Sequence, residues 1–333
     1  MGMKKAVLLL IILGFILPQT SFAYERLFYF FDNESGYDSL KDNYKSIDTF
    51  APQIYTVTDN LKVKGPTEKR AIKQAKRRNV DVVPLLVNDH FDKVLMSSIL
   101  ISEKAQNDII EFMIDEAKDE GYRGWQFDFE NINHLDRDMY TAFVKKTGEA
   151  MKENNLEFSV AVIVRDRPYD KNSTDQDWSS AYDFEELAKH VDFLSLMSYD
   201  DPRSVGPVAS IPYVKRILNY LLPIIPNEKI SLGIPLYCWQ WQDNVKVASV
   251  SYDRAKKAYK EVDDRKKKNS YSKSLGAEYF RFTRDGVHNE IWCDGAKGLT
   301  EKKKLIEKYD LRGYSAWALG QETDKWWRVL KRI

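Results

Sequence analysis

The sequence predicts an α/β protein built as a closed (β/α)8 TIM barrel, and three observations support this fold. Short apolar runs recur along the chain, amphipathic segments separate several of them, and 333 residues suffice for one large barrel. A doubly wound open sheet is the alternative. It normally carries a glycine-rich phosphate loop after an early strand, and none is present. Eight runs are predicted as strands: Leu27–Phe31, Gln53–Val57, Val80–Val87, Gly124–Phe129, Glu157–Val164, Phe193–Ser198, Ile230–Leu236 and Gly313–Leu319.

Helices are predicted where charged residues occupy one face and apolar residues the other. The clearest are Glu103–Glu120, Arg137–Asn154, Ile211–Leu222 and Leu299–Tyr309. Strands that alternate with helices in this way pair in parallel, which is the pattern that a barrel requires.

The interval between the last two strands is too long for one crossover helix. It contains a charged segment, Tyr252–Lys268, which we expect to be helical. It also contains two apolar runs, Glu278–Thr283 and Val287–Cys293, around an Asp-Gly pair that is typical of a hairpin turn. We therefore expect a small α+β insertion at about residues 240–297. In such barrels the loops that follow the strands form the active-site face, so the insertion is expected to wall a cleft.

The first 23 residues have the pattern of a secretory signal peptide. Lys4 and Lys5 precede the apolar run Ala6–Leu17, and Ser21-Phe22-Ala23 has small residues at both ends. The apolar run is too short to span a bilayer comfortably, although an uncleaved anchor is the alternative. We therefore expect residues 24–333 to form the barrel of a secreted or periplasmic protein with no membrane span after cleavage.

Composition excludes several classes of protein. Hydrophobic residues make up 43% of the chain and aromatic residues 13%, which excludes a disordered protein. The 51 Lys and Arg nearly equal the 50 Asp and Glu, so no nucleic-acid partner is predicted. The four histidines share neither a ligand spacing nor one element, so we predict no metal site. The protein is expected to be a monomer.

The only two cysteines lie at the two ends of the predicted insertion. Cys238 follows the seventh strand, and Cys293 ends the hairpin. A disulfide between them would attach the insertion to the barrel rim and stabilise the fold by about 3–4 kcal/mol in the chain-entropy model. Two separate buried thiols are the alternative.

The segment Gly124–Asn131 is the most informative for chemistry. Because side chains alternate along a strand, Gln126, Asp128 and Glu130 share one face, which points into the barrel. Burial and like charge raise the pKa of neighbouring carboxyl groups, and such a pair divides into one protonated acid and one ionised group. The alternative is that the strand end is solvated and the carboxylates cap a helix.

This segment resembles the fourth-strand motif of glycoside hydrolase family 18, D-G-x-D-x-D-x-E. Asp128 and Glu130 match the last two acidic positions, whereas Arg123 and Gln126 replace the first two. We expect Gln126 to hydrogen-bond Asp128 but not to share a proton with it. Three further segments resemble the family's motifs on the sixth, seventh and eighth strands: Met197-Ser-Tyr199-Asp200, Leu232–Tyr237 and Gly313–Gln321, which contains Trp317.

Two other segments are most similar to the bacterial spore-cortex-lytic N-acetylglucosaminidase branch of that family. These are Asp128–Asn131 followed by Asp136–Tyr140, and Ile291–Leu299. The chain lacks the LysM wall-binding modules that members of this branch commonly carry. The resemblance implies hydrolysis of β-linked N-acetylglucosamine glycans, of the peptidoglycan or chitin type, by retaining, substrate-assisted catalysis without a cofactor.

The resemblance also implies roles for individual residues. Glu130 would be the general acid and base, Asp128 would stabilise an oxazolinium intermediate, and Tyr199 would donate to the acetamido oxygen. Trp317 would form the floor under the −1 sugar. Further substrate-binding candidates are Gln126, Met197, Asp200, Tyr29, Tyr237 and Trp239.

Alternatives stay open at several of these positions. Asp200 would equally start a turn with Asp201 and Pro202, and tyrosines on barrel strands often only pack. Trp239 and Trp241 either stack on sugars, if exposed, or pack the insertion. The sequence assigns no role to Arg165, Asn88 and Asp89. A catalytically weak or silent, lectin-like protein on the same barrel is the alternative function, but the presence of both carboxylates argues against it.

Overall fold

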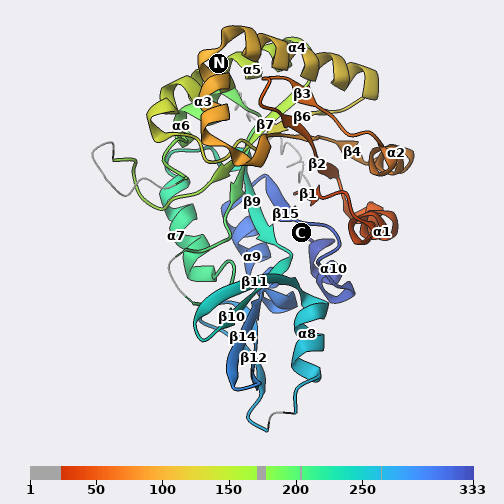
Figure 1. The fold of residues 1–333 in the computed structure, drawn as a ribbon, viewed down its shortest axis with the longest axis vertical. Helices are drawn as coiled ribbons and strands as arrows, with labels where there is room; N and C mark the ends of the chain where they lie inside the picture. The colour runs from red at the N-terminus through yellow and green to blue at the C-terminus, as the bar shows by residue number, and fades with distance from the viewer. Residues whose placement is uncertain (1–23, 171–177, 203–204, 264) are drawn as a thin grey trace, which may run out of the picture.

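The computed structural model describes residues 24–170, 178–202, 205–263 and 265–333. The predicted signal peptide, residues 1–23, lies outside the described residues. Eight parallel strands close into a barrel because β15 and β2 both pair with β1, which confirms the predicted fold (Figure 1). In order around the barrel these strands are β1 (Glu25–Phe30), β2 (Thr49–Val57), β5 (Leu85–Asn88), β6 (Gly124–Phe127), β7 (Glu157–Ile163), β8 (Phe193–Met197), β9 (Ile230–Pro235) and β15 (Gly313–Trp317).

The predicted third strand, Val80–Val87, is wrong in one respect, because it forms two pieces. β4 (Asp81–Val82) and β5 both pair with β2, and Pro84 lies between them. Proline has no N–H to donate, so it interrupts the ladder of hydrogen bonds at this point. A short strand, β3 (Val63–Lys64), pairs antiparallel with the far end of β2.

Helices surround the barrel (Figure 1). The four predicted helices correspond to α4 (Glu103–Glu120), α5 (Arg137–Glu153), α7 (Ile211–Leu221) and α9 (Gly295–Tyr309). Among the described residues no helix is both long and apolar enough to cross a bilayer. The remaining helices around the barrel are α1 (Glu34–Asn43), α2 (Arg70–Arg77), α3 (Lys93–Ile101), α6 (Phe184–His190) and α10 (Asp324–Leu330), with 3-10 turns at η1 (Tyr44–Ser46), η2 (Asp89–Phe91), η3 (His134–Asp136) and η4 (Asn227–Lys229).

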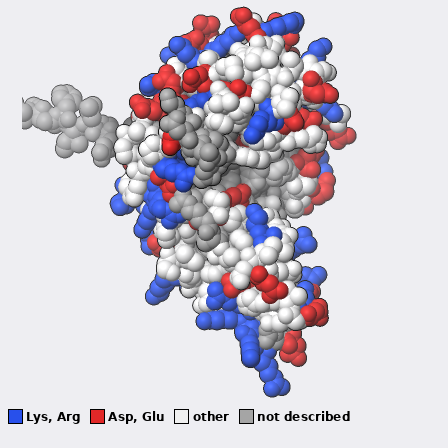
Figure 2. Space-filling view, turned by 60° about the vertical axis from the view of Figure 1, so that its left-hand side comes forward, with Lys and Arg blue, Asp and Glu red and all other residues white. Residues whose placement is uncertain are grey.

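A second, antiparallel sheet lies between β9 and β15 in the sequence and below the barrel in Figure 1. Its strand order is β11 (Val245–Ser251), β10 (Tyr237–Gln242), β14 (Val287–Cys293), β13 (Ala277–Arg284) and β12 (Lys268–Ser272). The predicted hairpin corresponds to β13 and β14, and both turn residues, Asp285 and Gly286, have positive φ as an Asp-Gly hairpin turn requires. Figure 2 shows Lys and Arg side chains gathered over the lower part of the molecule, which holds this sheet.

The predicted helix Tyr252–Lys268 is too long. α8 (Tyr252–Lys260) ends eight residues earlier, and Lys268 instead begins β12. The basic run Arg265–Lys268 offers no apolar side chain at helical spacing for the helix to bury. Cys238 and Cys293 form a disulfide that joins β10 to β14 where both strands meet the barrel.

A network of ion pairs closes the mouth of the barrel at the amino ends of its strands. Arg123 contacts Glu25 (2.5 Å) and Glu157 (2.7 Å), and Arg312 contacts the same two carboxylates (2.6 and 2.8 Å). Arg123 is one of the residues that depart from the family motif. At the next position, a Cβ on Gly124 would lie only 1.9 Å from the Glu157 carbonyl oxygen. The segment before the acidic residues therefore serves packing and ion pairing at the opposite end of the barrel.

Replacing Arg123 by Met should lower the free energy of unfolding by about 3 kcal/mol, because two largely buried carboxylates would then share a single guanidinium. Denaturant unfolding measures this difference. The matched control is Arg70→Met, because Arg70 pairs with Glu34 and both side chains are more than half exposed. That variant should unfold at the wild-type midpoint. An Arg123→Met midpoint equal to that of the wild type would contradict a structural role for the network.

Candidate active site

A cavity of about 650 Å³ opens at the carboxyl ends of the barrel strands. Its lining includes five of the residues that the sequence singled out: Glu130, Met197, Tyr199, Asp200 and Trp317. These residues lie beyond or at the ends of β6, β8 and β15, so parallel pairing brings them to one edge of the barrel. This edge is where barrel proteins place their functional groups.

Alternation of side chains along the β6 segment brings Glu130 to this cavity and Asp128 into the barrel interior. Trp125 faces outward and donates its indole N–H to the Met113 carbonyl of α4 (2.7 Å). Gln126 and Asp128 point into the barrel, where they are 0% and 1% exposed. Glu130 follows on the same side and reaches the cavity itself. The Oδ2 atom of Asp128 is buried and has no hydrogen-bond partner among the described residues.

Burial dominates the electrostatics of this pair. It raises the pKa of Asp128, and it raises the pKa of Glu130 together with the negative charges of Asp128 and Asp200. Glu130 therefore keeps a proton at a pH where an exposed glutamate would be ionised. A protonated carboxyl group at the cavity wall, with a buried carboxyl group two residues earlier on the same face, has the arrangement of a general acid and a charge-stabilising partner.

Asn88, to which the sequence assigned no role, holds Glu130 in place. Its side-chain oxygen accepts from the Glu130 backbone N–H (3.0 Å), and its amide nitrogen donates to the Glu130 carbonyl (3.1 Å). Tyr182 adds a hydrogen bond from its hydroxyl to the carbonyl of Phe129 (2.8 Å). The one signal for Asn88 in the sequence is its place at the carboxyl end of a predicted barrel strand.

Gln126 does not bond Asp128, which corrects the expectation from the sequence. Its Oε1 accepts from the Tyr29 hydroxyl (2.7 Å), and its Nε2 donates to Ser159 Oγ (2.9 Å). The Tyr29 oxygen lies 2.6 Å from Ser195 Oγ. Side chains of β1 and β7 thus satisfy the amide, and Asp128 receives no hydrogen bond from it. Tyr29 supports the site from beneath.

Asp200 belongs to a turn and also lines the cavity. Its backbone is left-handed (φ 58°), a conformation that Asp adopts more readily than most residues. The Tyr237 hydroxyl donates to Asp200 Oδ1 at 2.5 Å. Burial raises the pKa of Asp200, and the hydrogen bond from Tyr237 and the charge of Lys246 partly oppose this rise. Both sequence alternatives for Asp200 are therefore compatible with the structure.

Aromatic rings form one wall of the cavity. Trp317 contacts Tyr29 and Phe31, with ring centroids 5.0 and 4.8 Å apart, and these contacts fix the plane of the indole. The rings of Tyr199 and Tyr237 lie 6.4 Å apart, edge to face. A flat indole of fixed orientation suits the apolar face of a sugar ring.

Trp239 does not line this cavity. Its ring is only 3% exposed, contacts Trp241 at 5.6 Å, and lies under the ammonium group of Lys246 at 4.3 Å. These contacts favour packing over sugar stacking at this position. Arg165 does line the cavity, and it also donates to the Ser179 and Tyr182 carbonyls (2.7 and 2.9 Å), so it also binds the backbone just before α6.

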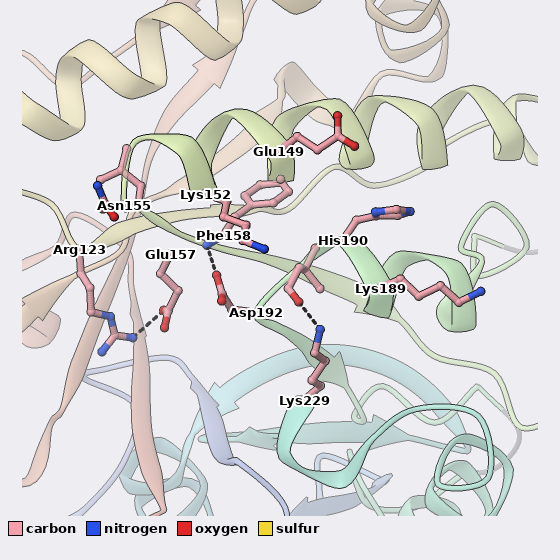
Figure 3. Close-up of a pocket in the computed structure, with 13 residues that line it drawn as sticks. Arg123, Glu149, Lys152, Asn155, Glu157, Phe158, Lys189, His190, Asp192 and Lys229 are labelled. Carbon is pink, nitrogen blue, oxygen red and sulfur yellow. Dashed lines mark hydrogen bonds and ion pairs between the residues drawn. The ribbon is translucent and has the colours of Figure 1, made fainter.

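A larger cavity, of about 730 Å³, lies near the other end of the barrel (Figure 3). Its charged side chains form hydrogen bonds with backbone groups at the ends of strands and helices. Lys229 donates to the Ala188 and Val191 carbonyls (2.7 and 2.8 Å), and Asp192 accepts from the Phe158 N–H (2.8 Å). We therefore assign the candidate active site to the smaller cavity. Within the described part of the chain, no three His, Cys, Asp or Glu side chains are placed to hold a metal ion.

Comparisons with known proteins show which sequences and structures this chain is similar to. The family model described as "Glycosyl hydrolases family 18" matches residues 20–322. The chain is 26% identical over 308 residues to the uncharacterized glycosylase YvbX of Bacillus subtilis, covering 90% of this chain and 88% of YvbX. It is 27% identical over 259 residues to the cortical fragment-lytic enzyme of Bacillus subtilis, covering 75% of this chain and 58% of that enzyme.

Solved structures are similar in fold. A chitinase from Chromobacterium violaceum superposes with a TM-score of 0.83 at 23% identity, covering 93% of this chain and 98% of that one. The spore cortex-lytic enzyme SleL of Bacillus megaterium superposes with a TM-score of 0.81 at 24% identity, covering 92% of this chain and 73% of that one.

Proposed function

The chain belongs to the glycosyl hydrolases family 18 and is a glycoside hydrolase, and on that premise we propose that it hydrolyses β-linked N-acetylglucosamine glycans with retention of configuration. The nucleophile is the 2-acetamido oxygen of the substrate, so the enzyme needs no metal and no carboxylate nucleophile. This family is an exception to the usual pair of catalytic carboxylates in glycosidases. The proposed substrates are glycans of the peptidoglycan or chitin type.

In the first step Glu130 donates its proton to the glycosidic oxygen. The acetamido oxygen attacks the anomeric carbon as the glycosidic bond breaks, and an oxazolinium ion forms. Asp128 accepts the acetamido N–H and stabilises the positive charge, and Tyr199 donates its hydroxyl to the acetamido oxygen. Trp317 supports the sugar from below. Because the carboxyl groups are largely buried, their interactions with this charge are stronger than they would be in water.

In the second step the Glu130 carboxylate accepts a proton from water. The water oxygen attacks the anomeric carbon from the face that the leaving group vacated, and the acetamido group is restored. Glu130 thus regains the proton that it lost, so the carboxyl group is ready for the next cycle.

One observation carries this proposal. A glutamate whose pKa is raised faces the same cavity as Tyr199, Asp200 and Trp317, and the buried Asp128 precedes it by two residues, close enough for its charge to act on that glutamate. These residues also lie in the segments that resemble the family's motifs on the fourth, sixth and eighth strands.

Release of reducing ends from purified peptidoglycan and from N-acetylchitohexaose tests the proposal. We expect the wild-type enzyme to release reducing ends from at least one of these glycans without added metal, and to remain active in the presence of a chelator. An enzyme that releases reducing ends from neither glycan would contradict the proposed substrate class.

We further propose that the first 23 residues direct export and are then removed. The support is the pattern of the sequence alone: a basic start, a short apolar run and small residues at the exit. Amino-terminal sequencing of the protein from the producing cell tests this, and a mature chain that begins at Tyr24 is the expected result.

A further inference from the structure

One face of the second sheet carries a row of five side chains, three of them cations, that the proposed mechanism does not use; we call it the row of cations. The strand register places Lys268, Arg281, Glu290, Trp241 and Lys246 directly opposite one another on successive strands. Residues opposite each other in an antiparallel pair point to the same face. Since neighbouring strands are about 4.8 Å apart, the five-strand row is about 19 Å long.

The next row along the same face is aromatic. Tyr279, Trp292 and Trp239 lie opposite one another on β13, β14 and β10. The other face of the sheet is already occupied, because Tyr252 and Tyr259 of α8 pack on Phe280 and Phe282. The row of cations is therefore on the face of the sheet that points away from α8.

The aromatic row holds the cations in place. The Arg281 guanidinium lies 4.6 Å from the Tyr279 ring centroid and 5.6 Å from that of Trp292, and Lys246 lies 4.3 Å from that of Trp239. Glu290 contacts Arg281 (3.1 Å) and accepts from the Trp292 indole N–H (2.9 Å). The side chain of Arg281 nevertheless remains 40% exposed. Such contacts reduce the conformational entropy that a cation loses when it binds an anion.

The near end of this row contacts the segment that follows Asp200. At its near end, the charge of Lys246 acts on Asp200, which lines the catalytic cavity. Trp241, the neighbour of Lys246 in the row, donates its indole N–H to the Gly206 carbonyl (2.9 Å), in the segment that follows Asp200. From Lys246 the row continues through Trp241 and Glu290 to Arg281 and Lys268, so two further cations lie beyond Lys246.

Charge is distributed unevenly between the two parts of the chain. Residues 237–293 carry 12 Lys and Arg against 8 Asp and Glu, although the whole chain is almost neutral. Figure 2 shows this excess of cations over the lower part of the molecule. An excess of cations on the second sheet and its helix favours an anionic polymer over a neutral one.

We infer that Lys246, Arg281 and Lys268 form a specificity-determining site for carboxylate groups carried by the glycan itself. The substrate class that this site selects is an N-acetylated glycan with carboxylate substituents on its sugars, such as the lactyl groups of peptidoglycan, in preference to neutral chitin. This inference rests on the proposed function, because it concerns the same polymer in the same cleft.

The test compares two forms of one glycan. Peptidoglycan strands freed of their peptides carry lactyl carboxylates, and coupling these groups to methylamine gives a neutral polymer of the same backbone. The variants are Arg281→Gln combined with Lys268→Gln, both remote from the catalytic pair, and Lys268→Gln alone. The matched control is Lys257→Gln, because Lys257 is an exposed lysine on α8, which covers the other face of the sheet.

At low ionic strength the wild type should show a kcat/KM about tenfold higher on the carboxylate form than on the amidated form, the effect of two ion pairs at exposed sites. The double variant should lose this preference, Lys268→Gln should lose part of it, and Lys257→Gln should keep it. Salt should reduce the preference in the wild type. A double variant that keeps the tenfold preference, or a wild type that has none, would overturn the inference. Cleavage of neither form would instead contradict the proposed function.

Discussion

Replacing Glu130 by Gln should lower kcat on an N-acetylglucosamine glycan by about 10³-fold or more, because the amide cannot protonate the glycosidic oxygen. The amide has nearly the shape of the carboxyl group, and Asn88 bonds only the backbone of residue 130 (3.0 and 3.1 Å), so the fold should be retained. Glycan binding should remain within a few-fold of the wild type. Initial rates of reducing-end release and calorimetric titration with a chitooligosaccharide measure the two properties.

The matched control for this variant is Glu149→Gln. Glu149 is an exposed glutamate at the larger cavity near the opposite end of the barrel (Figure 3). Its replacement should leave kcat unchanged if the chemistry occurs at the carboxyl ends of the strands. Retained turnover in Glu130→Gln, or loss of turnover in the control, would remove Glu130 from the role of general acid.

Replacing Asp128 by Asn should lower kcat/KM by about 10²–10³-fold, because the oxazolinium ion then loses its negatively charged partner in a buried site. The size of the effect follows from the burial of Asp128, which is 1% exposed and has an Oδ2 atom with no hydrogen-bond partner in the described part of the chain. Steady-state kinetics on the same glycan measure it. A loss of less than tenfold would contradict an electrostatic role.

The same variant should also shift the pH profile. The negative charge of Asp128 raises the pKa of Glu130, so its removal lowers that pKa. Glu130 acts in its protonated form, and the alkaline limb of kcat/KM reports the loss of that proton in the free enzyme. The alkaline limb should therefore move to lower pH in Asp128→Asn. The matched control is Asp136→Asn, because Asp136 is a buried aspartate that accepts from the Ser97 hydroxyl outside the cavity. In this variant the alkaline limb of kcat/KM should stay in place.

The sequence predicted the barrel because its signals are local. For example, α4 begins after Ser102, whose hydroxyl accepts from the Ala105 N–H (3.2 Å), and ends at Gly121 in a left-handed conformation. Both are standard helix signals that need no tertiary information. Where local signals conflicted with hydrogen bonding or burial, the prediction was wrong: Pro84 divides the third strand, and the lysine-rich end of the predicted insertion helix has no apolar face.

The site could be predicted only in part, because its finer features depend on pairing between strands. The alternation of side chains along β6 is a local property, and it was enough to predict that Asp128 and Glu130 share one face. The double hydrogen bond from Asn88 to the Glu130 backbone requires β5 to lie beside β6. The partners of Gln126, Tyr29 and Ser159, come from two other strands, so the sequence suggested a bond to Asp128 instead.

The burial of Trp239 likewise could not be derived from the sequence. A tryptophan next to a strand end is equally compatible with stacking on a sugar and with packing in a sheet. The outcome depends on Trp241 and Lys246, which reach it from β10 and β11 of the second sheet. The row of cations on that sheet depends on the same strand register, and composition alone indicated only a nearly neutral chain.

Inhibition by a thiazoline analogue of the oxazolinium intermediate tests the central claim most directly, because only a mechanism that uses the substrate's acetamido group produces that intermediate. The measurement is the inhibition constant of the thiazoline against initial rates of glycan hydrolysis. We expect an inhibition constant about 10²-fold or more below KM, as for a stable mimic of a high-energy intermediate. An enzyme that cleaves the glycan at full rate in the presence of saturating thiazoline would contradict substrate-assisted catalysis at Glu130 and Asp128.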